Sequence, residues 1–485
     1  MSHLQLSRPD REHKEKHMSY NYSLGRMLGF YTVVAFLFWH IVNTVQPGKL
    51  IDEIFHVTQA QNYCSGNFTH WDEKITTLPG LYILSVGLLY PTANVLGVEL
   101  AQLCTTQTLR LTNVLLSIAN VYLFFTIFNK LHAPTKVETA NKNVFGALNL
   151  GLWPPLLFFS STYYTDMAAT FMVILMLSLH LHGNNFMASL AGLFSIFVRQ
   201  TNIVWVLWVG ARVFDFNLRE SLYFTRAERC YENVHTVKEI QCIFRGFQRV
   251  RDRGAFIKMM VSTIATSLGY ITVAIIFVAF YLFNGSIVVG DRNAHKPGIN
   301  LPQIFYFGGF SFCFLLPFYL PILPDFLRFF RKRKLVFVLC ALICILVIYS
   351  NTVVHPYNLA DNRHFSFYAW KIVYEKLPLG RYLPVPLYVF SLYCGYVYVI
   401  RTEPYLVTVG FLVLSALSIV PQCLIDVRYF FIIFILLRLH IPNRSRILLV
   451  TELVLYTIVN ALALVIFSVK TFKWDDSDEW QRIMW

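Results

Sequence analysis

Residues 51–57, with the sequence IDEIFHV, follow directly on the first apolar segment of the chain, residues 27–45. That segment is long enough to cross a bilayer, so residues 51–57 begin the first loop on the far side. A helix through this stretch places Asp52 and His56 on one face, because they are four residues apart. A carboxylate with a partner histidine is what a general base acting on a hydroxyl requires. A solvated loop that merely contains acids, Glu53 among them, is the alternative.

The composition indicates a membrane protein. The chain has 485 residues, of which 56% are hydrophobic and 14% charged, which is too apolar for one soluble core. Apolar runs of membrane length recur, so we expect an all-α polytopic membrane protein with about 12–14 crossings. The net charge of +14 lies in short segments between apolar runs, as the positive-inside rule describes. No motif of a nucleic-acid-binding fold is present, so no nucleic-acid partner is expected.

The basic segments predict the topology and one transmembrane domain, residues 25–485. The predicted parts are a cytosolic tail at 1–24, a large first lumenal loop with interfacial helices at 48–107, a cytosolic loop at 212–258, a lumenal loop at 355–382 and a lumenal tail at 470–485. A glycosylation sequon, Asn67-Phe68-Thr69, falls in the first lumenal loop. The nine cysteines show no CxxC or CxxH spacing, so we expect them to pack as small apolar side chains, without metal binding or disulfides.

Two apolar runs are ambiguous. Residues 78–98 contain Pro79, Pro91 and Asn94, and we interpret them as helices in the lumenal interface, with a full span as the alternative. Arg199 interrupts another apolar run, and an arginine at membrane depth is costly unless it faces a polar cavity. We therefore expect two short helices that meet at the lumenal side near Arg199, with one helix and a buried arginine as the alternative.

The scarce ionic groups gather on the predicted lumenal side. They are Asp52, Glu53, His56, Asp72, Lys74, Asp166, Arg199, Asp291, Arg292, His295, Asp361, Arg363, His364 and Arg428. An acid can activate a hydroxyl, and arginine and histidine can bind a phosphate, so the set suits an enzyme acting on a lipid phosphate. A carrier would place charges at mid-bilayer within matched halves, and we find no internal repeat.

Some of these residues have ordinary alternatives. Arg428 precedes an apolar segment and could anchor a helix at the interface, and Asp72 with Lys74 could form a surface salt bridge. Asp291 and His295 are too few to predict a metal site. No glycine-rich phosphate loop, nucleophile elbow or zinc motif is present, so a nucleotide-sugar donor is not indicated.

Seven motifs together resemble one family. They are IDEIFH (51–56), WDEKITTLPGLY (71–82), YTD (164–166), RQTN (199–202), GDR (290–292), ADNRHF (360–365) and QRIMW (481–485). The family is the endoplasmic-reticulum α-1,2-glucosyltransferases that use dolichyl-phosphate glucose. These enzymes add the third glucose to the lipid-linked oligosaccharide for N-glycosylation. The resemblance runs from about residue 50 to residue 485 and leaves out residues 1–23 and 212–258.

The resemblance implies a GT-C glycosyltransferase fold in the endoplasmic-reticulum membrane, with a cytosolic N terminus and a lumenal active site. It implies that the 2-hydroxyl of the terminal glucose on a dolichyl-pyrophosphate oligosaccharide attacks dolichyl-phosphate glucose with inversion, without a metal cofactor. A different dolichyl-phosphate-sugar transferase is the nearer alternative, and a carrier or channel-associated protein the more distant one.

The resemblance also assigns roles to residues. We expect Asp52 to be the base, with Glu53 as the second candidate. The residues expected to bind the donor phosphate are Arg363, His364, Arg428 and Arg199. The residues expected on the acceptor side or in support are His56, Asp72, Lys74, Asp361, Asp291 and His295.

Overall fold

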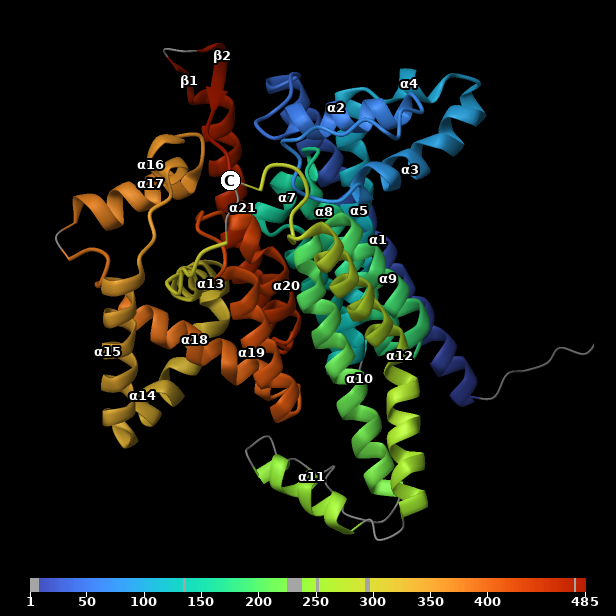
Figure 1. Ribbon diagram of the computed structural model, residues 1–485, viewed down its shortest axis with the longest axis vertical. Helices are drawn as coiled ribbons and strands as arrows, with labels where there is room; N and C mark the ends of the chain where they lie inside the picture. The colour runs from blue at the N-terminus through green and yellow to red at the C-terminus, as the bar shows by residue number, and fades with distance from the viewer. Residues whose placement is uncertain are drawn as a thin grey trace, which may run out of the picture.

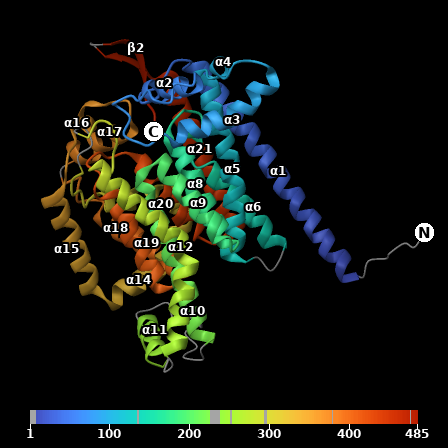
Figure 2. The same ribbon diagram turned by 45° about the vertical axis from the view of Figure 1, so that its right-hand side comes forward.

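The computed structural model describes residues 8–133, 137–224, 238–249, 253–292, 297–377, 379–474 and 477–485. It is a bundle of helices with one short β-hairpin, which confirms the predicted all-α membrane architecture (Figures 1 and 2). The first half contains α1 (Arg8–Val45), α2 (Glu53–Cys64), α3 (Gly80–Leu96), α4 (Leu100–Leu103), α5 (Thr106–His132), α6 (Val137–Gly151), α7 (Pro154–Ser160), α8 (Thr165–Leu181), α9 (Asn185–Val198), η1 (Gln200–Asn202), α10 (Ile203–Phe224) and α11 (Lys238–Arg249).

The second half completes the bundle. It contains α12 (Arg253–Asn284), α13 (Gln303–Tyr319), η2 (Leu320–Ile322), α14 (Leu323–Lys332), α15 (Lys334–Asn351), α16 (Pro356–Ala360), α17 (Phe365–Trp370), η3 (Lys371–Lys376), α18 (Val385–Ile400), α19 (Tyr405–Ile419), η4 (Val427–Phe430), α20 (Phe431–Leu439), α21 (Arg446–Val469), β1 (Thr471–Trp474) and β2 (Ser477–Arg482). One continuous hydrophobic core connects helices from α1 to α21.

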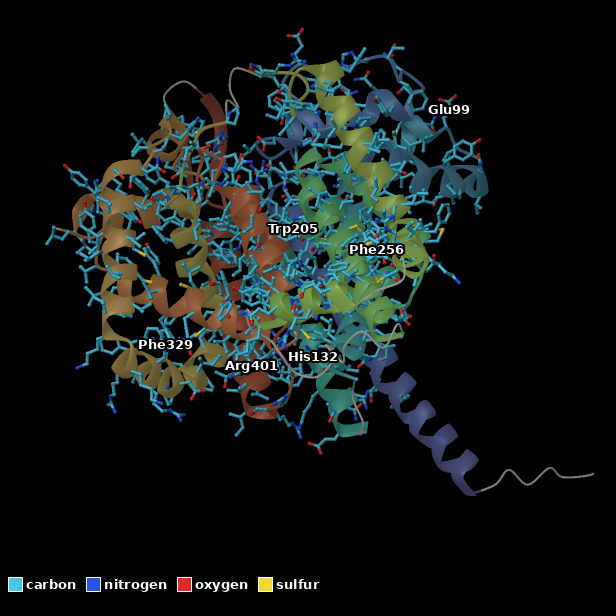
Figure 3. The ribbon with its side chains drawn as sticks, turned by 60° about the horizontal axis from the view of Figure 1, so that its bottom comes forward. Glu99, His132, Trp205, Phe256, Phe329 and Arg401 are labelled. Atoms are coloured by element: carbon cyan, nitrogen blue, oxygen red, sulfur yellow. A yellow bond between two sulfur atoms is a disulfide. The ribbon has the colours of Figure 1, made fainter. Side chains whose placement is uncertain are left out.

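The two ends of the bundle carry different elements. The helices α2, α3, α4, α16 and α17 and the hairpin lie together at one end, and α11 and the lower part of α14 lie at the other (Figure 1). Figure 3 shows Phe329, Arg401 and His132 in a row along the lower part of the view, and Glu99 at its upper right. The two ends of the bundle thus differ in the elements they carry, and the predicted assignment of loops to two compartments stays a prediction.

Fewer described helices than the predicted 12–14 crossings are long and apolar enough to span a membrane. Among the described residues, six helices are long and apolar enough to span a membrane, or seven if the bent pair α7 and α8 is counted as one span. Four more apolar helices have 10–17 residues, among them α3 and α9. The expected 12–14 crossings are therefore not confirmed, because several apolar runs break into helices too short to cross alone.

Two of these breaks bring polar groups into the bundle. The chain bends by 114° between α7 and α8, and it breaks at Arg199, where α9 ends and η1 leads into α10. The predicted break at Arg199 is therefore confirmed, although only α9, with 14 residues, is short, since α10 has 22. The turn between α7 and α8 is fully buried, so its backbone groups need partners inside the protein. Asn113 donates to the carbonyl oxygens of Thr162 and Tyr164 at 2.8 and 2.9 Å.

A disulfide corrects the prediction for the cysteines. Cys64, the last residue of α2, is bonded to Cys104, two residues before α5. The cysteines lie 40 residues apart, and sequence spacing alone does not reveal such a pair. The bond links the end of α2 to the segment that leads into α5.

We expect the Cys64→Ser variant to lose about 4 kcal/mol of unfolding free energy, since cross-linking a loop of this length restricts the unfolded chain. Thermal unfolding of the purified protein measures the loss. Cys340→Ser is the control because Cys340 is exposed and not in a disulfide, and its unfolding should match the wild type. Equal stability of the two variants would contradict the prediction.

The C-terminal residues form a structure that the sequence did not predict. β1 and β2 pair antiparallel, with Thr471 opposite Arg482 and Trp474 opposite Ser477. Beyond β2, His364 and Met484 form an isolated parallel bridge. Within the tail predicted at 470–485, β1 and β2 therefore pair with each other, and Trp474 and Met484 contact the loop between α16 and α17.

Candidate active site

The site begins at the turn that leads into α2. Ile51 has φ of 41°, a left-handed conformation that is strained for a β-branched residue. The hydroxyl of Tyr164 holds this turn, because it accepts from the Asp52 N–H at 3.2 Å and donates to the Leu50 carbonyl at 3.1 Å. The Asp52 side chain is 39% exposed. The strained turn at Ile51 thus holds the Asp52 carboxylate where solvent can reach it, at the start of α2.

Arg428 lies between two acids. Its guanidinium is 3.0 Å from the Asp52 carboxylate and 2.7 Å from that of Asp426. Burial opposes the charge on Asp52, but the charge of Arg428 and its hydrogen bond to the carboxylate favour the ionised form, and the pKa of the carboxyl lies below the ordinary value of 3.8. Asp52 is therefore ionised at neutral pH, as a proton acceptor must be.

A second ion pair comes from the two helix breaks. Arg199 donates to Asp166 at 2.6 Å, and Asp166 is 1% exposed while the Arg199 side chain is 19% exposed. The charge of Asp166 is close enough to contribute to the raised pKa of Arg428, after Asp426 and Asp52. The structure thus brings Asp52, Arg428 and Arg199, from widely separated parts of the sequence, into one electrostatic cluster.

His56 faces a tyrosine. Its Nδ1 atom is 2.7 Å from the hydroxyl of Tyr82 on α3. Burial lowers the pKa of His56 below 6.5, against the opposing charge of Asp52, so the imidazole is neutral at pH 7. The expected Asp52–His56 face is present, since the His56 N–H bonds to the Asp52 carbonyl at 3.2 Å. The direct side-chain partner of His56 is Tyr82.

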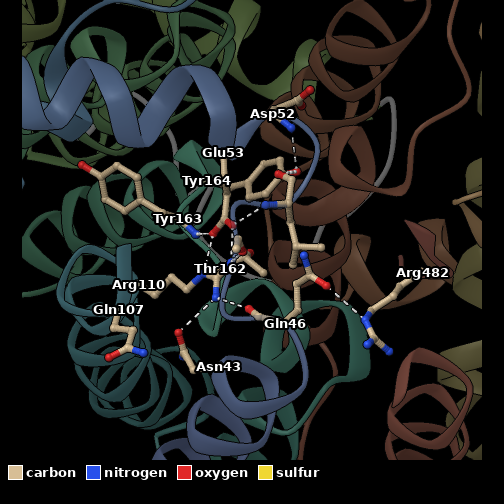
Figure 4. A network of polar contacts seen from close by, with 12 residues as sticks. Asn43, Gln46, Asp52, Glu53, Gln107, Arg110, Thr162, Tyr163, Tyr164 and Arg482 are labelled. Carbon is tan, nitrogen blue, oxygen red and sulfur yellow. Dashed lines mark hydrogen bonds and ion pairs between the residues drawn. The ribbon is translucent and has the colours of Figure 1, made fainter. Parts of the chain in front are cut away.

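Glu53 has a structural role (Figure 4). Its carboxylate is fully buried and pairs with Arg110 on α5, with Nε at 2.9 Å and Nη2 at 2.5 Å. It also accepts from the backbone N–H groups of Leu50 at 2.8 Å and Tyr163 at 2.6 Å. Both oxygens are occupied, and neither reaches solvent. Glu53 therefore joins the turn before α2 to the buried turn before α8, and the geometry does not favour it as the base.

The predicted cluster at 361–364 lies near the hairpin. Arg363 forms a two-pronged pair with Asp361, at 2.9 and 2.8 Å, and its guanidinium lies 4.5 Å from the centre of the Trp474 ring. The His364 Nε2 atom is 3.8 Å from Asp361. Burial opposes ionisation of Asp361, but its bonds to Arg363 and the charge of His364 lower its pKa below 3.8. These groups form a compact cluster of one acid, its arginine partner and a histidine.

The remaining predicted residues connect two loops. The Asp72 carboxylate accepts from the Lys74 N–H at 2.9 Å, and the Lys74 ammonium is 3.6 Å from Asp291 with 63% of its side chain exposed. The Asp291 N–H donates to the Glu73 carbonyl at 2.8 Å. These residues therefore support the first loop, and His295 lies outside the described residues.

Three residues of the site were missed by sequence reasoning. They are Arg110, Tyr82 and Asp426, which hold Glu53, His56 and Arg428. Arg110 gave one usable signal, a charge inside an apolar run. Within the described ranges, no three His, Cys, Asp or Glu residues are grouped so that they could hold a metal ion.

The pKa of Asp52 predicts the pH dependence of any reaction that uses it as a base. Because the carboxyl protonates only below 3.8, we expect the rate per active site to vary less than about twofold between about pH 7 and pH 5. Initial rates in buffers of constant ionic strength test this. A fall in rate between pH 7 and pH 5, centred below 6.5, would instead point to His56.

Comparison with known proteins defines the class. A mouse protein is 35% identical over 442 residues, covering 90% of this chain and 93% of its own length, and a human protein is 33% identical with the same coverage. An Arabidopsis thaliana protein is 31% identical over 494 residues, covering 92% of this chain and 96% of its own. All three are named Dol-P-Glc:Glc(2)Man(9)GlcNAc(2)-PP-Dol alpha-1,2-glucosyltransferase. The class is thus a polytopic membrane glycosyltransferase.

The family model described as the DIE2/ALG10 family matches residues 46–439. The chain belongs to this family. The match begins in the turn before Asp52 and includes Arg199, Arg363 and Arg428. No solved structure matches the chain.

Proposed function

We propose that this chain transfers glucose from dolichyl-phosphate glucose to the 2-hydroxyl of the terminal glucose on a diglucosylated, dolichyl-pyrophosphate-linked oligosaccharide. Membership of the DIE2/ALG10 family and the shared name of the relatives support the substrates. The observation that carries the chemistry is the partly exposed carboxylate of Asp52 held 3.0 Å from Arg428. Asp52 can take the proton of an attacking hydroxyl. The cation beside it can stabilise the negative charge that develops on the phosphate of the lipid-linked sugar donor.

In the proposed reaction, the acceptor hydroxyl oxygen attacks the anomeric carbon of the donor glucose. Its proton passes to Asp52, a new glycosidic bond forms, and the bond between the anomeric carbon and the phosphate oxygen breaks. Dolichyl phosphate leaves with the bonding electron pair, and the β-linked donor gives an α-linked product. We assign Asp52 as the base in preference to Glu53, whose two oxygens already accept four hydrogen bonds.

The departing phosphate gains negative charge, which donors and cations can stabilise. We assign this role to Arg363 and His364, together with Arg428 and Arg199. Arginine is suited to it because its planar donors match phosphate oxygens. The phosphate makes the lipid a good leaving group, so the proposed reaction needs no metal.

We propose that the end of the bundle with α2, α16 and the hairpin faces the lumen of the endoplasmic reticulum. The basic segment at 328–334 lies at the opposite end with α14, and basic segments favour the cytosol. A tag inserted at the exposed Asn67–Thr69 turn should be protected from protease in sealed microsomes, whereas a tag before α1 should be digested. Digestion of both tags, or protection of both, would contradict this orientation.

The direct test incubates purified protein with synthetic dolichyl-phosphate glucose and a diglucosylated acceptor lipid, then analyses the product by mass spectrometry. We expect a gain of one hexose, linked α-1,2. Transfer from dolichyl-phosphate mannose, or to a monoglucosylated acceptor only, would replace the proposal with another dolichyl-phosphate-sugar transferase.

A further inference from the structure

Residues 482–485 contact both halves of the proposed site. On one side, the Met484 N–H donates to the Arg363 carbonyl at 2.7 Å, and the Phe365 N–H donates to the Met484 carbonyl at 3.1 Å. The ring Nδ1 of His364 is 3.0 Å from the Trp485 carbonyl oxygen. Met484 is 1% exposed. The backbone on both sides of His364, and its ring, are therefore fixed by this segment.

On the other side, Arg482 reaches the ends of two spans. Its guanidinium donates to the carbonyls of Val45 at 3.1 Å and of Phe467 and Ser468 at 3.0 Å. Val45 ends α1, and the other two belong to the last turn of α21. Carbonyls in the last helical turn lack partners within the helix, and a cation there is stabilised by the helix dipole. Arg482 therefore anchors the segment to helix ends.

The same arginine contacts the turn that carries Asp52. Its Nε donates to the Gln46 side chain at 3.1 Å, and the Gln46 carbonyl accepts from Arg110 at 2.9 Å (Figure 4). Arg110 in turn holds Glu53, the neighbour of Asp52. A continuous series of hydrogen bonds thus runs from Arg482 to the start of α2.

We infer that residues 482–485 form a strap that sets the distance between the base, Asp52, and the cations Arg363 and His364, and that Arg482 is a positioning residue for glucose transfer. The inference rests on the roles proposed above for those three residues. An in-line displacement needs the base and the phosphate-binding groups at a fixed separation across the sugar. Misplacement by about 1 Å is enough to lower a rate roughly 10²-fold.

The test compares the Arg482→Ala, Arg482→Lys and Trp480→Ala variants of the full-length protein in lipid nanodiscs. Trp480 is the matched control, since it lies on the same strand, is 58% exposed and has Lys473 over its ring. Hydrogen exchange followed by mass spectrometry reports on the peptides containing Phe365 and Met484. Steady-state kinetics give kcat and KM for donor and acceptor.

We expect Arg482→Ala to speed exchange at Phe365 and Met484 and to lower kcat roughly 10- to 100-fold, with the acceptor KM changed less than about threefold. Arg482→Lys should recover part of kcat, and Trp480→Ala should behave as the wild type. To separate positioning from lost folding, rates are taken per folded molecule, counted by the cooperative thermal transition.

Two results would overturn the inference. One is faster exchange at Phe365 and Met484 with an unchanged kcat, and the other is a loss of kcat that follows the loss of folded protein alone. Neither result affects the proposed function, which fails instead if the wild-type protein does not transfer glucose. If Asp52→Asn transfers glucose at the wild-type rate, Asp52 is not the base. The hydrogen exchange measured at Phe365 and Met484 in the Arg482 variants would be unaffected by that result.

Discussion

The Asp52→Asn variant should transfer glucose roughly 10²- to 10⁴-fold more slowly than the wild type, because an amide cannot take the proton of the acceptor hydroxyl. The loss should appear in kcat, since asparagine keeps the size of the side chain and its contact with Arg428. Initial rates with saturating donor and acceptor measure it. The remaining activity reports what the cations and substrate positioning contribute without the base.

Asp325→Asn is the matched control for this substitution. Asp325 pairs with Arg328 on α14 and has 46% of its side chain exposed. The helix α14 lies at the opposite end of the bundle from α2 (Figure 1). The rate and thermal transition of Asp325→Asn should equal those of the wild type. If Asp52→Asn stays within about threefold of the wild-type rate, the base lies elsewhere.

The Arg110→Met variant should lose about 3–5 kcal/mol of unfolding free energy, because it leaves the Glu53 carboxylate buried without its cation. Arg110 also donates to the carbonyls of Gln46 and Gly48, so the turn before Asp52 loses further bonds. Denaturation in detergent micelles measures the loss. The effect should exceed that of any exposed ion pair in the chain.

Two variants make this prediction specific. Glu53→Gln combined with Arg110→Met removes both charges, and it should recover part of the lost stability because no unpaired charge remains. Arg328→Met breaks the exposed pair with Asp325 and should cost less than about 1 kcal/mol. If Arg110→Met costs no more than Arg328→Met, the Glu53–Arg110 pair does not hold the turn.

Much of the architecture could be predicted from the sequence because membrane insertion acts on local composition. Short basic segments and long apolar runs assign loops to two ends, and an arginine in an apolar run marks the break at Arg199. The number of spans could not be predicted in the same way. Whether an apolar run crosses the membrane or bends depends on side chains elsewhere in the sequence. Asn113 on α5, for example, donates to two backbone carbonyls of the turn before α8.

The site was predictable only in part. The motifs locate Asp52, Arg199 and Arg363, but sequence does not say which of two adjacent acids is buried. That choice depends on Arg110, 57 residues after Glu53. The disulfide and the C-terminal strap escaped prediction for the same reason, since each joins segments whose proximity is set by the packing of several helices.

The order of Asp52 and Glu53 in the sequence limits which substitutions the chain tolerates at these two positions. Successive positions at the start of a helix point about 100° apart, so Asp52 and Glu53 look in different directions, one outward and one into the protein. Exchanging them would send the shorter side chain inward, where it would fall short of Arg110, and the longer one outward. The two adjacent acids are therefore not interchangeable, because Glu53 holds the turn and Asp52 is the residue proposed as the base.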